Sequence, residues 1–318
     1  MSAISGTATT LTTKGIREDL EDTIYRVAPS KTPFTNNVGN AGKATNTYHE
    51  WQTETLASPA ANAQLEGDDS PSFASSENIT TRIGNYCQIF RKVGIVSGTD
   101  EVVKKAGRAS EINRQKVLKG IELRTDMELA WLNNTASNQE SGGTARHSGG
   151  FQTWLTSNVS QGGGGGTTGF SGGVTAASVP GTTRTLTESL LKNVRATAFG
   201  NGATPSQAYM SGATKQTMSA FTGIASIRVD AKPTEQATIV GAADVYIDDF
   251  GKITFIPHQY AVSGAVLLVD PDMVGIATLR GMFTDTLAQT GDATKFQILA
   301  EKTLVMKNQK AHAMIQAV

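Results

Sequence analysis

Two runs of alternating residues, one on each side of a polar stretch, most constrain how this chain folds. Residues 45–56 (TNTYHEWQTETL) and 79–98 (ITTRIGNYCQIFRKVGIVSG) alternate as strands do, so we expect a long two-legged β-hairpin with a loose tip. A leg of about 20 residues reaches roughly 65 Å, whereas a compact 318-residue chain has a radius of gyration near ~20 Å. Because an isolated two-stranded hairpin is only marginally stable in water, it needs another surface to lie on. A neighbouring copy of the same chain is the simplest candidate.

Charge is segregated along the chain. Residues 44–81 contain six acidic side chains and no Lys or Arg, whereas residues 104–124 contain seven basic and two acidic side chains. Taken separately, each run is explained by a solvated loop or a solvated helix face. The whole chain is neutral, with 28 basic and 28 acidic residues, which argues against a protein that wraps nucleic acid through a global positive charge. Complementary patches steer encounter and fix register, and our hypothesis is that the two runs meet.

Three stretches have helical periodicity. The strongest runs from Ser110 to Asn133, about 36 Å at ~1.5 Å per residue. Its predicted apolar face consists of Val117, Leu118, Ile121, Leu129 and Leu132. A short amphipathic helix is expected over 14–28, and another helix from its N-cap Thr187 to Gly200.

The remaining sequence predicts loops and short strands. Residues 29–45 are expected to be extended or irregular, and the glycine-rich stretch 141–183 is expected to be a flexible loop that cannot bury a face. Strands are predicted over 208–212, 225–231, 244–258, 264–270, 273–279, 294–308 and 310–318. The turn at 249–252 indicates a hairpin, and Asn308 and Gln309 are predicted at a tight turn between the last two strands.

No pattern indicates a catalytic, cofactor-binding or metal site. The four histidines lack ligand spacing and are expected on the surface or in strands: His49, His147, His258 and His312. The run 162–166 lacks the pattern of a phosphate-binding loop, and the lone Cys87 makes neither an intrachain disulfide nor a cysteine-based zinc site. The aspartates near the C-terminal half lack EF-hand spacing. An enzyme with an irregular site that uses Asp248 and His258 stays open as an alternative.

Targeting signals are also absent from the sequence pattern. No run approaches roughly 18 apolar residues, so no membrane span is predicted. The polar N-terminus lacks the basic and apolar regions of a signal peptide. We therefore expect a soluble protein made in a cytoplasm.

The order of the expected elements carries a family resemblance. An N-terminal arm, an acidic hairpin, a long helix, a glycine-rich break, a mixed α/β portion and closing strands follow one another. This order resembles the major capsid protein of tailed bacteriophages, of the Hong Kong 97 type. The matching stretches are 26–56, 116–134 and 302–318, and the likeness spans nearly the whole chain, weakest across 141–183. None of these stretches is a catalytic signature.

The resemblance implies an α+β fold with peripheral and axial domains. The expected parts are an N-terminal arm (1–45), an extended β-hairpin loop (46–98), a spine helix and Gly-rich loop of the peripheral domain (99–184), an axial domain (185–265) and closing strands of the peripheral domain (266–318). In this interpretation the acidic loop of one subunit lies across the spine helix of the next.

The resemblance further implies a structural role without enzymatic activity or cofactor. Hexamers and pentamers would close into an icosahedral shell around packaged DNA, forming part of a virion assembled in the host cytoplasm. The implied partners are other copies of the chain, a scaffolding protein, a portal, decoration proteins and DNA in non-specific contact, with no membrane. A phage tail or surface appendage subunit stays open as an alternative, because such a protein is also neutral, β-rich and glycine-rich.

The predicted intersubunit contacts follow from the two charged runs. On the extended loop they are Glu50, Trp51, Glu54, Glu66, Asp68 and Asp69. On the spine helix and the segment before it they are Lys104, Lys105, Arg108, Arg114, Lys116 and Lys119. Shells of this type can be joined by an isopeptide bond from a loop lysine. Since no lysine occurs between Lys43 and Lys92, we expect non-covalent shells.

Overall fold

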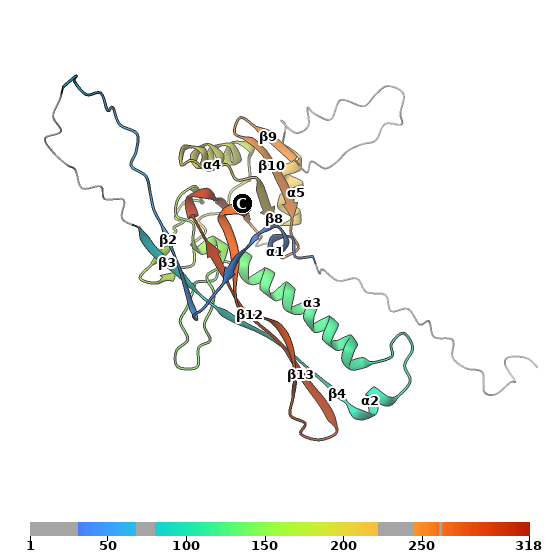
Figure 1. The fold of residues 1–318 in the computed structure, drawn as a ribbon. Coiled ribbons are helices and arrows are strands. Elements are labelled where there is room, and N and C mark those ends of the chain that lie inside the picture. The colour runs from blue at the N-terminus through green and yellow to red at the C-terminus, as the bar shows by residue number, and fades with distance from the viewer. Residues whose placement is uncertain (1–30, 68–79, 222–244, 261–262) are drawn as a thin grey trace, which may run out of the picture.

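The computed structural model describes residues 31–67, 80–221, 245–260 and 263–318. The helix expected over 14–28 and the strand expected over 225–231 lie outside these ranges. Within the described residues, strands form two main sheets and two small hairpins, with helices packed on the main sheets (Figure 1). The expected irregular stretch 29–45 contains a short helix, α1 (Pro33–Asn37), and a strand, β1 (Gly39–Lys43).

The first main sheet is four-stranded and built around a long hairpin. Its strands, in spatial order, are β1, β12 (Val274–Leu287), β13 (Ala293–Met306) and β4 (Gln88–Ser97). β12 and β13 pair antiparallel, β4 pairs antiparallel with β13, and β1 adds to β12 in parallel. The strand expected over 273–279 is therefore twice as long as the sequence pattern indicated. Its second half contains polar residues and remains a strand because it pairs with β13.

Helix α3 (Glu111–Leu132) packs on β4 and β13 and confirms the predicted ends of the long helix. The Ser110 hydroxyl accepts a hydrogen bond from Asn113 N, as an N-cap does. The predicted apolar face is wrong in part: Leu132 is buried as predicted, whereas Val117 and Leu129 are exposed. The residues that face the core are Leu123, Met127 and Trp131, spaced by four positions and so on one side of the helix.

The second main sheet is six-stranded and has its own core. Its strands, in spatial order, are β5 (Val159–Ser160), β14 (Ala313–Gln316), β11 (Ala265–Val269), β8 (Gln207–Met210), β10 (Gly251–Pro257) and β9 (Val245–Asp248). Helices α4 (Glu188–Gly200) and α5 (Gly212–Ser219) pack against it. Thr187 caps α4 by accepting from Leu190 N, as predicted, and β9 and β10 form the predicted hairpin. The strands of this sheet come from the predicted axial domain (185–265) and also from residues outside it, such as β5 and β14.

Within the described residues the chain crosses between the two sheets three times. One crossing is long and runs from β4 through α3 to β5. The other two are short: the first is η3 (Pro271–Met273), between β11 and β12, and the second is η4 (Gln309–Ala311), between β13 and β14. The predicted tight turn at Asn308 is therefore wrong, since β13 and β14 lie in different sheets. Asn308 instead caps the turn of η4 by accepting from Lys310 N at 3.0 Å, which redirects the chain into the second sheet.

The two short crossings are hydrogen-bonded to each other. The Met273 carbonyl accepts from Lys307 N at 3.1 Å and from His312 Nε2 at 3.2 Å. Asp270 N donates to His312 Nδ1 at 3.2 Å, so the proton of this imidazole is on Nε2. His312 is fully buried, and burial lowers its pKa to about 4.

The glycine-rich stretch 141–183 is not the flexible loop that its composition predicted. It contains a buried turn, η1 (Phe151–Thr153), and the small hairpin of β6 (Phe170–Ser171) and β7 (Val174–Thr175). Phe151, Trp154 and Leu155 belong to the main hydrophobic core. Glycine allows this packing because the backbones at Gly162 and Gly181 approach so closely that a Cβ on either would meet backbone atoms.

Candidate assembly surfaces

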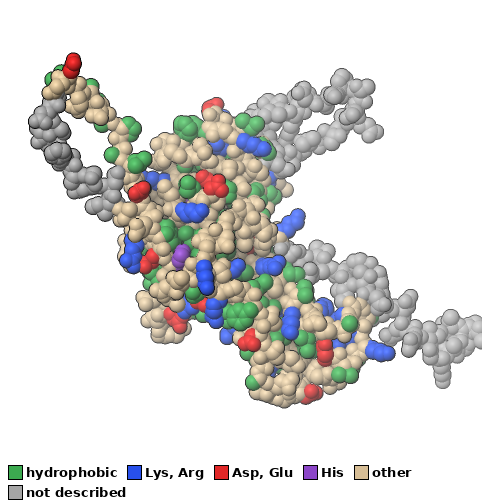
Figure 2. Space-filling view, viewed as in Figure 1, with side chains coloured by type: hydrophobic (Ala, Val, Ile, Leu, Met, Phe, Trp, Pro, Cys, Tyr) green, Lys and Arg blue, Asp and Glu red, His purple; other side chains and the backbone are tan. Residues whose placement is uncertain are grey.

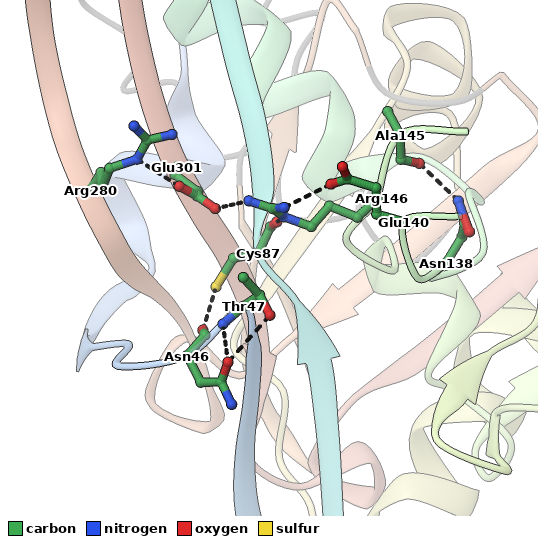
Figure 3. Close-up of polar contacts among 9 residues, drawn as sticks. All are labelled: Asn46, Thr47, Cys87, Asn138, Glu140, Ala145, Arg146, Arg280 and Glu301. Carbon is green, nitrogen blue, oxygen red and sulfur yellow. Dashed lines mark hydrogen bonds and ion pairs between the residues drawn. The ribbon is translucent and has the colours of Figure 1, made fainter. Parts of the chain in front are cut away.

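The extended loop begins as a short hairpin of β2 (Tyr48–Thr53) and β3 (Thr81–Tyr86). The predicted second leg of about 20 residues is wrong, because the chain leaves this hairpin at Cys87 and continues as β4 in the four-stranded sheet. Cys87 N donates to Thr47 O at 2.8 Å, and the Cys87 carbonyl accepts from Arg146 Nε at 2.7 Å (Figure 3). Arg146 therefore fixes the point at which the chain stops pairing with β2 and begins to pair with β13.

A buried carboxylate supports this point from the other side. Glu301 in β13 pairs with Arg146 and accepts from Arg280 Nε at 2.7 Å, and Arg146 also contacts Glu140 at 2.8 Å (Figure 3). The network joins β12, β13 and the glycine-rich stretch to the base of the loop. The Cys87 thiol is buried beside it, and burial, with the nearby Glu301 charge, raises the pKa of the thiol to about 11. Such a thiol is unreactive at neutral pH.

The base of the loop is anchored on its own chain. Trp51 Nε1 donates to Met306 O at 2.8 Å, and the indole packs 5.4 Å from Trp154, which stacks on Phe170 at 5.6 Å. Tyr48 OH donates to Gly173 O at 3.0 Å. The predicted intersubunit residue Trp51 therefore lies half-buried against its own core. The glycine-rich stretch forms the surface on which the hairpin sits.

Glu50 also has a partner within the hairpin. Arg82 Nε donates to Glu50 Oε1 at 2.7 Å, and this hydrogen bond, helped by the guanidinium charge, lowers the pKa of Glu50. Both side chains lie at the surface.

The outer part of the loop projects away from the body (Figure 1). Residues 54–67 are exposed and have no regular secondary structure beyond a turn at the end. Glu54 and Glu66 are exposed, and Leu56 and Leu65 are 83% and 82% exposed. In Figure 2 the coloured part of this projection shows acidic and apolar side chains and no basic ones. Asp68 and Asp69, the other two predicted contacts, lie outside the described residues.

The predicted basic residues are brought onto one region, yet most have partners there. Arg108 and Arg114 both pair with Glu111. Hydrogen bonding from Gln115, together with these two guanidinium groups, lowers the pKa of Glu111. One carboxylate therefore serves two guanidinium groups, and it balances part of the positive charge of this stretch within its own chain.

Two of the four predicted lysines of this region also pair with a carboxylate of their own chain. Lys105 pairs with Asp100 at 3.4 Å and Lys119 with Glu122 at 2.9 Å. Lys116 lies over the Phe296 ring, 5.7 Å from its centroid. Lys104 is exposed and forms no ion pair with a described carboxylate.

A buried carboxylate near the C-terminal end of α3 was missed by the sequence analysis. Glu128 accepts from Phe34 N at 2.7 Å, from Thr35 N at 2.9 Å and from the Thr35 hydroxyl. His258 Nε2 donates at 2.8 Å to Glu128 Oε1, the oxygen that also accepts from Phe34 N, while His258 Nδ1 accepts from Tyr260 N at 3.0 Å. Glu128 therefore fixes α1 on α3 beside the end of β10. Nothing in its local sequence distinguishes it from a surface glutamate.

The predicted irregular enzyme site is not assembled. His258 follows β10, whereas Asp248 lies at the hairpin turn at the other end of that strand and pairs with Arg195 at 2.9 Å. His258 and His312 are buried, contrary to a surface position. Within the described part of the chain, no group of three or more His, Cys, Asp or Glu side chains is placed to hold a metal ion. None of the described helices is both long and apolar enough to cross a bilayer.

Comparison with known proteins gives the family. The family model described as SU10 major capsid protein matches residues 3–318. A curated relative, the major capsid protein of Escherichia phage Phieco32, is 32% identical over 111 residues, which are 35% of this chain and 31% of the relative. That match spans about a third of the relative's length.

Solved structures share the fold over nearly the whole chain. The capsid asymmetric unit of Cyanophage A-1(L) has a TM-score of 0.68 at 12% identity, covering 98% of this chain and 99% of the other. Mycobacterium phage Bobi has a TM-score of 0.61 at 12% identity, covering 95% of each chain. The capsid of a native GTA particle has a TM-score of 0.62 at 9% identity, covering 96% and 97%. The expected α+β, Hong Kong 97-like fold is confirmed, and the chain belongs to the SU10 major capsid protein family.

Proposed function

We propose that this chain is a structural subunit that assembles with copies of itself into the icosahedral capsid of a tailed bacteriophage and encloses its DNA. The observation that carries the proposal is the family match over residues 3–318. The role is structural and needs no catalytic step or cofactor. Hexamers and pentamers are the proposed building units, and the virion is the proposed location, after assembly in the host cytoplasm.

The extended loop supports self-assembly. Its base is fixed by Trp51 and Tyr48, whereas residues 54–67 stand in solvent with two large apolar side chains exposed. An exposed segment of this kind is stabilised when it packs on another surface. The proposed surface is the peripheral domain of a neighbouring subunit, with the division into peripheral and axial domains also part of the proposal.

Other partners belong to the same proposal. A separate scaffolding protein, a portal and non-specific contact with DNA accompany a shell of this type. One structural neighbour, from phage G, is described with gp26 decoration proteins, at a TM-score of 0.53 and 11% identity. We extend decoration proteins to this chain as a proposal.

Electron microscopy of the purified full-length chain tests the proposed function. Closed shells of uniform diameter support it. Tubes or discrete trimers would instead support the alternative, a tail or surface appendage subunit, and would overturn the capsid proposal.

The bonding between subunits is tested separately. Residues 44–91 contain no lysine, so the outer part of the loop has no lysine amine for an isopeptide bond. Denaturing gels of mature particles should therefore show one band at 33.4 kDa. A ladder of covalent multimers that resists reduction would contradict the non-covalent shell without affecting the capsid role.

A further inference from the structure

A pocket between α1, α3 and the β12–β13 hairpin has an unusual charge. Its volume is about 790 Å³, within the usual range of roughly 300–1,000 Å³ for ligand sites. Lys31, Arg124 and Lys302 line it, and no described Asp or Glu does. None of these three side chains forms an ion pair within the described residues. Three positive charges therefore share one cavity without a counter-charge.

Neighbouring electrostatics agree with this geometry. Burial, with the nearby Arg124 charge, lowers the pKa of Lys302, so the two cations disfavour each other. An anion between them would relieve that repulsion. By contrast, the predicted basic residues Arg108, Arg114 and Lys119 already have carboxylate partners in their own chain. The pocket therefore gathers three cations that have no carboxylate partner among the described residues, and one of them, Arg124, is the last basic residue of the run 104–124.

The pocket is held open by the fold. One wall is α1, whose first residues are fixed by hydrogen bonds to the buried Glu128 carboxylate. The opposite wall consists of Lys302 and Met282 on the long hairpin, with Met127 of α3 as a buried apolar patch. A site with this rigidity needs little reorganisation to receive a ligand.

The lining favours a peptide over a phosphate. Besides its cations, the pocket offers the side chains of Met127 and Met282, which a bare phosphate would not use. The exposed loop segment 54–67 carries each acid close to a leucine, as Glu54 and Leu56 and as Leu65 and Glu66. On the loop, a carboxylate lies next to an aliphatic side chain, and in the pocket, a cation lies next to a methionine, so the two surfaces are complementary.

The loop must come from another molecule. In Figure 1 the loop leaves the body on the side away from α3, so its own pocket is out of reach. We propose that the pocket of one subunit binds Glu54 or Glu66, with the adjacent leucine, from the extended loop of a second copy. This inference rests on the proposed function, and it replaces the predicted basic run as the acceptor of the acidic loop.

Charge reversal tests the pairing. In the full-length chain, the double variant Arg124→Glu/Lys302→Glu should lower the yield of closed shells at least about tenfold, because like charges then face each other. Adding Glu54→Lys and Glu66→Lys to the same chain should restore the yield to within about threefold of wild type. Lys252→Glu is the matched control, since it reverses an exposed charge outside the pocket and outside the predicted contacts. If the double variant does not fold, Arg124→Gln alone serves as the test variant. It removes one positive charge from the pocket at an exposed position, and it should also lower the yield of closed shells.

The outcomes separate the two proposals. Normal shells from the Arg124→Glu/Lys302→Glu variant would overturn the pocket assignment while leaving the capsid role intact. Normal shells that lose packaged DNA would overturn it in favour of a phosphate site. Failure of the wild-type chain to form shells under any condition would instead refute the proposed function.

A disulfide trap gives an independent readout. The variant Glu66→Cys/Lys302→Cys should form intersubunit disulfides in assembled shells under mild oxidation, seen as a ladder on non-reducing gels. The native Cys87 does not interfere because it is buried. Glu66→Cys/Lys252→Cys is the control and should give no ladder, because Lys252 is exposed and lies outside the pocket. Equal ladders from both variants, or none from the first in closed shells, would contradict the proposal.

Discussion

Two segments of this chain look alike in sequence and differ in structure. The glycine-rich stretch 141–183 and the loop segment 54–67 are both polar and poor in periodic pattern. The first buries Phe151, Trp154 and Leu155 in the main core, whereas the second leaves Leu56 and Leu65 almost fully exposed. Composition alone therefore does not tell whether a polar, non-periodic segment packs in the core or stands exposed in solvent.

The difference arises from aromatic anchors and close backbone contacts. The glycine-rich stretch contains Trp154 and Phe170, which stack, and glycines whose backbones meet. The loop segment 54–67 contains no aromatic residue. A glycine-rich segment can thus be a packed part of the core when a few large side chains repay the entropy of ordering it.

The largest effect should come from removing the central anchor. Trp154→Ala deletes a buried indole between Trp51 and Phe170, and it should lower the free energy of unfolding by about 3–5 kcal/mol. Urea unfolding followed by circular dichroism measures this. A loss below about 1 kcal/mol would mean that the stretch is not part of the cooperative core.

Acid should weaken the same region through His312, whose ring contacts Phe151. The pKa of His312 is about 4 when folded, against about 6.5 when unfolded, so the unfolded state binds the extra proton between these values. Stability should fall by roughly 3 kcal/mol as pH drops from 6.5 to 4. His312→Phe should flatten this slope, even though it lowers stability at pH 7. An unchanged slope would contradict the assignment.

A matched pair of glycines tests the close contact itself. Gly162→Ala places a methyl group against the Thr182 backbone and should cost about 2 kcal/mol, whereas Gly163→Ala meets nothing within 4 Å and should cost less than about 0.5 kcal/mol. Thermal melts of the two variants measure the difference. Equal melting temperatures would show that the stretch is looser than described.

The smallest effect on the single chain should come from the loop. Leu56→Ser and Leu65→Ser should each change the free energy of unfolding by less than about 0.5 kcal/mol, because both side chains are exposed. Shell yield, measured by sedimentation, should nonetheless fall. A large loss of monomer stability would place the loop on its own body and remove the contrast between the two segments.

Features set by local sequence were predictable. Ser110 and Thr187 cap their helices because a side-chain oxygen close in sequence satisfies a free backbone N–H, and the β9–β10 turn is equally local. The buried face of α3 was not predictable, because the sheet that covers it comes from distant strands. The corner at Asn308 failed for the same reason: pairing of β14 with β11 decides it.

The candidate site was predicted in part. On the acidic side, Glu54 and Glu66 are exposed, and their contact with a second subunit stays a prediction. On the basic side, local counting drew attention to Arg108 and Arg114, which share Glu111 as a partner within their own chain. Sequence spacing could not join Lys31 and Lys302 in one pocket, because the tertiary fold alone brings the two ends of the chain together.

The paired crossings between the sheets have a mechanical consequence. A single connecting segment between two sheets would allow one sheet to rotate relative to the other about the bonds of that segment. Here two connections run side by side and share the Met273 carbonyl, with Lys307 and His312 as donors. Twisting one sheet relative to the other would strain both connections at once and expose a buried imidazole, so the pair transmits torque instead of acting as a swivel.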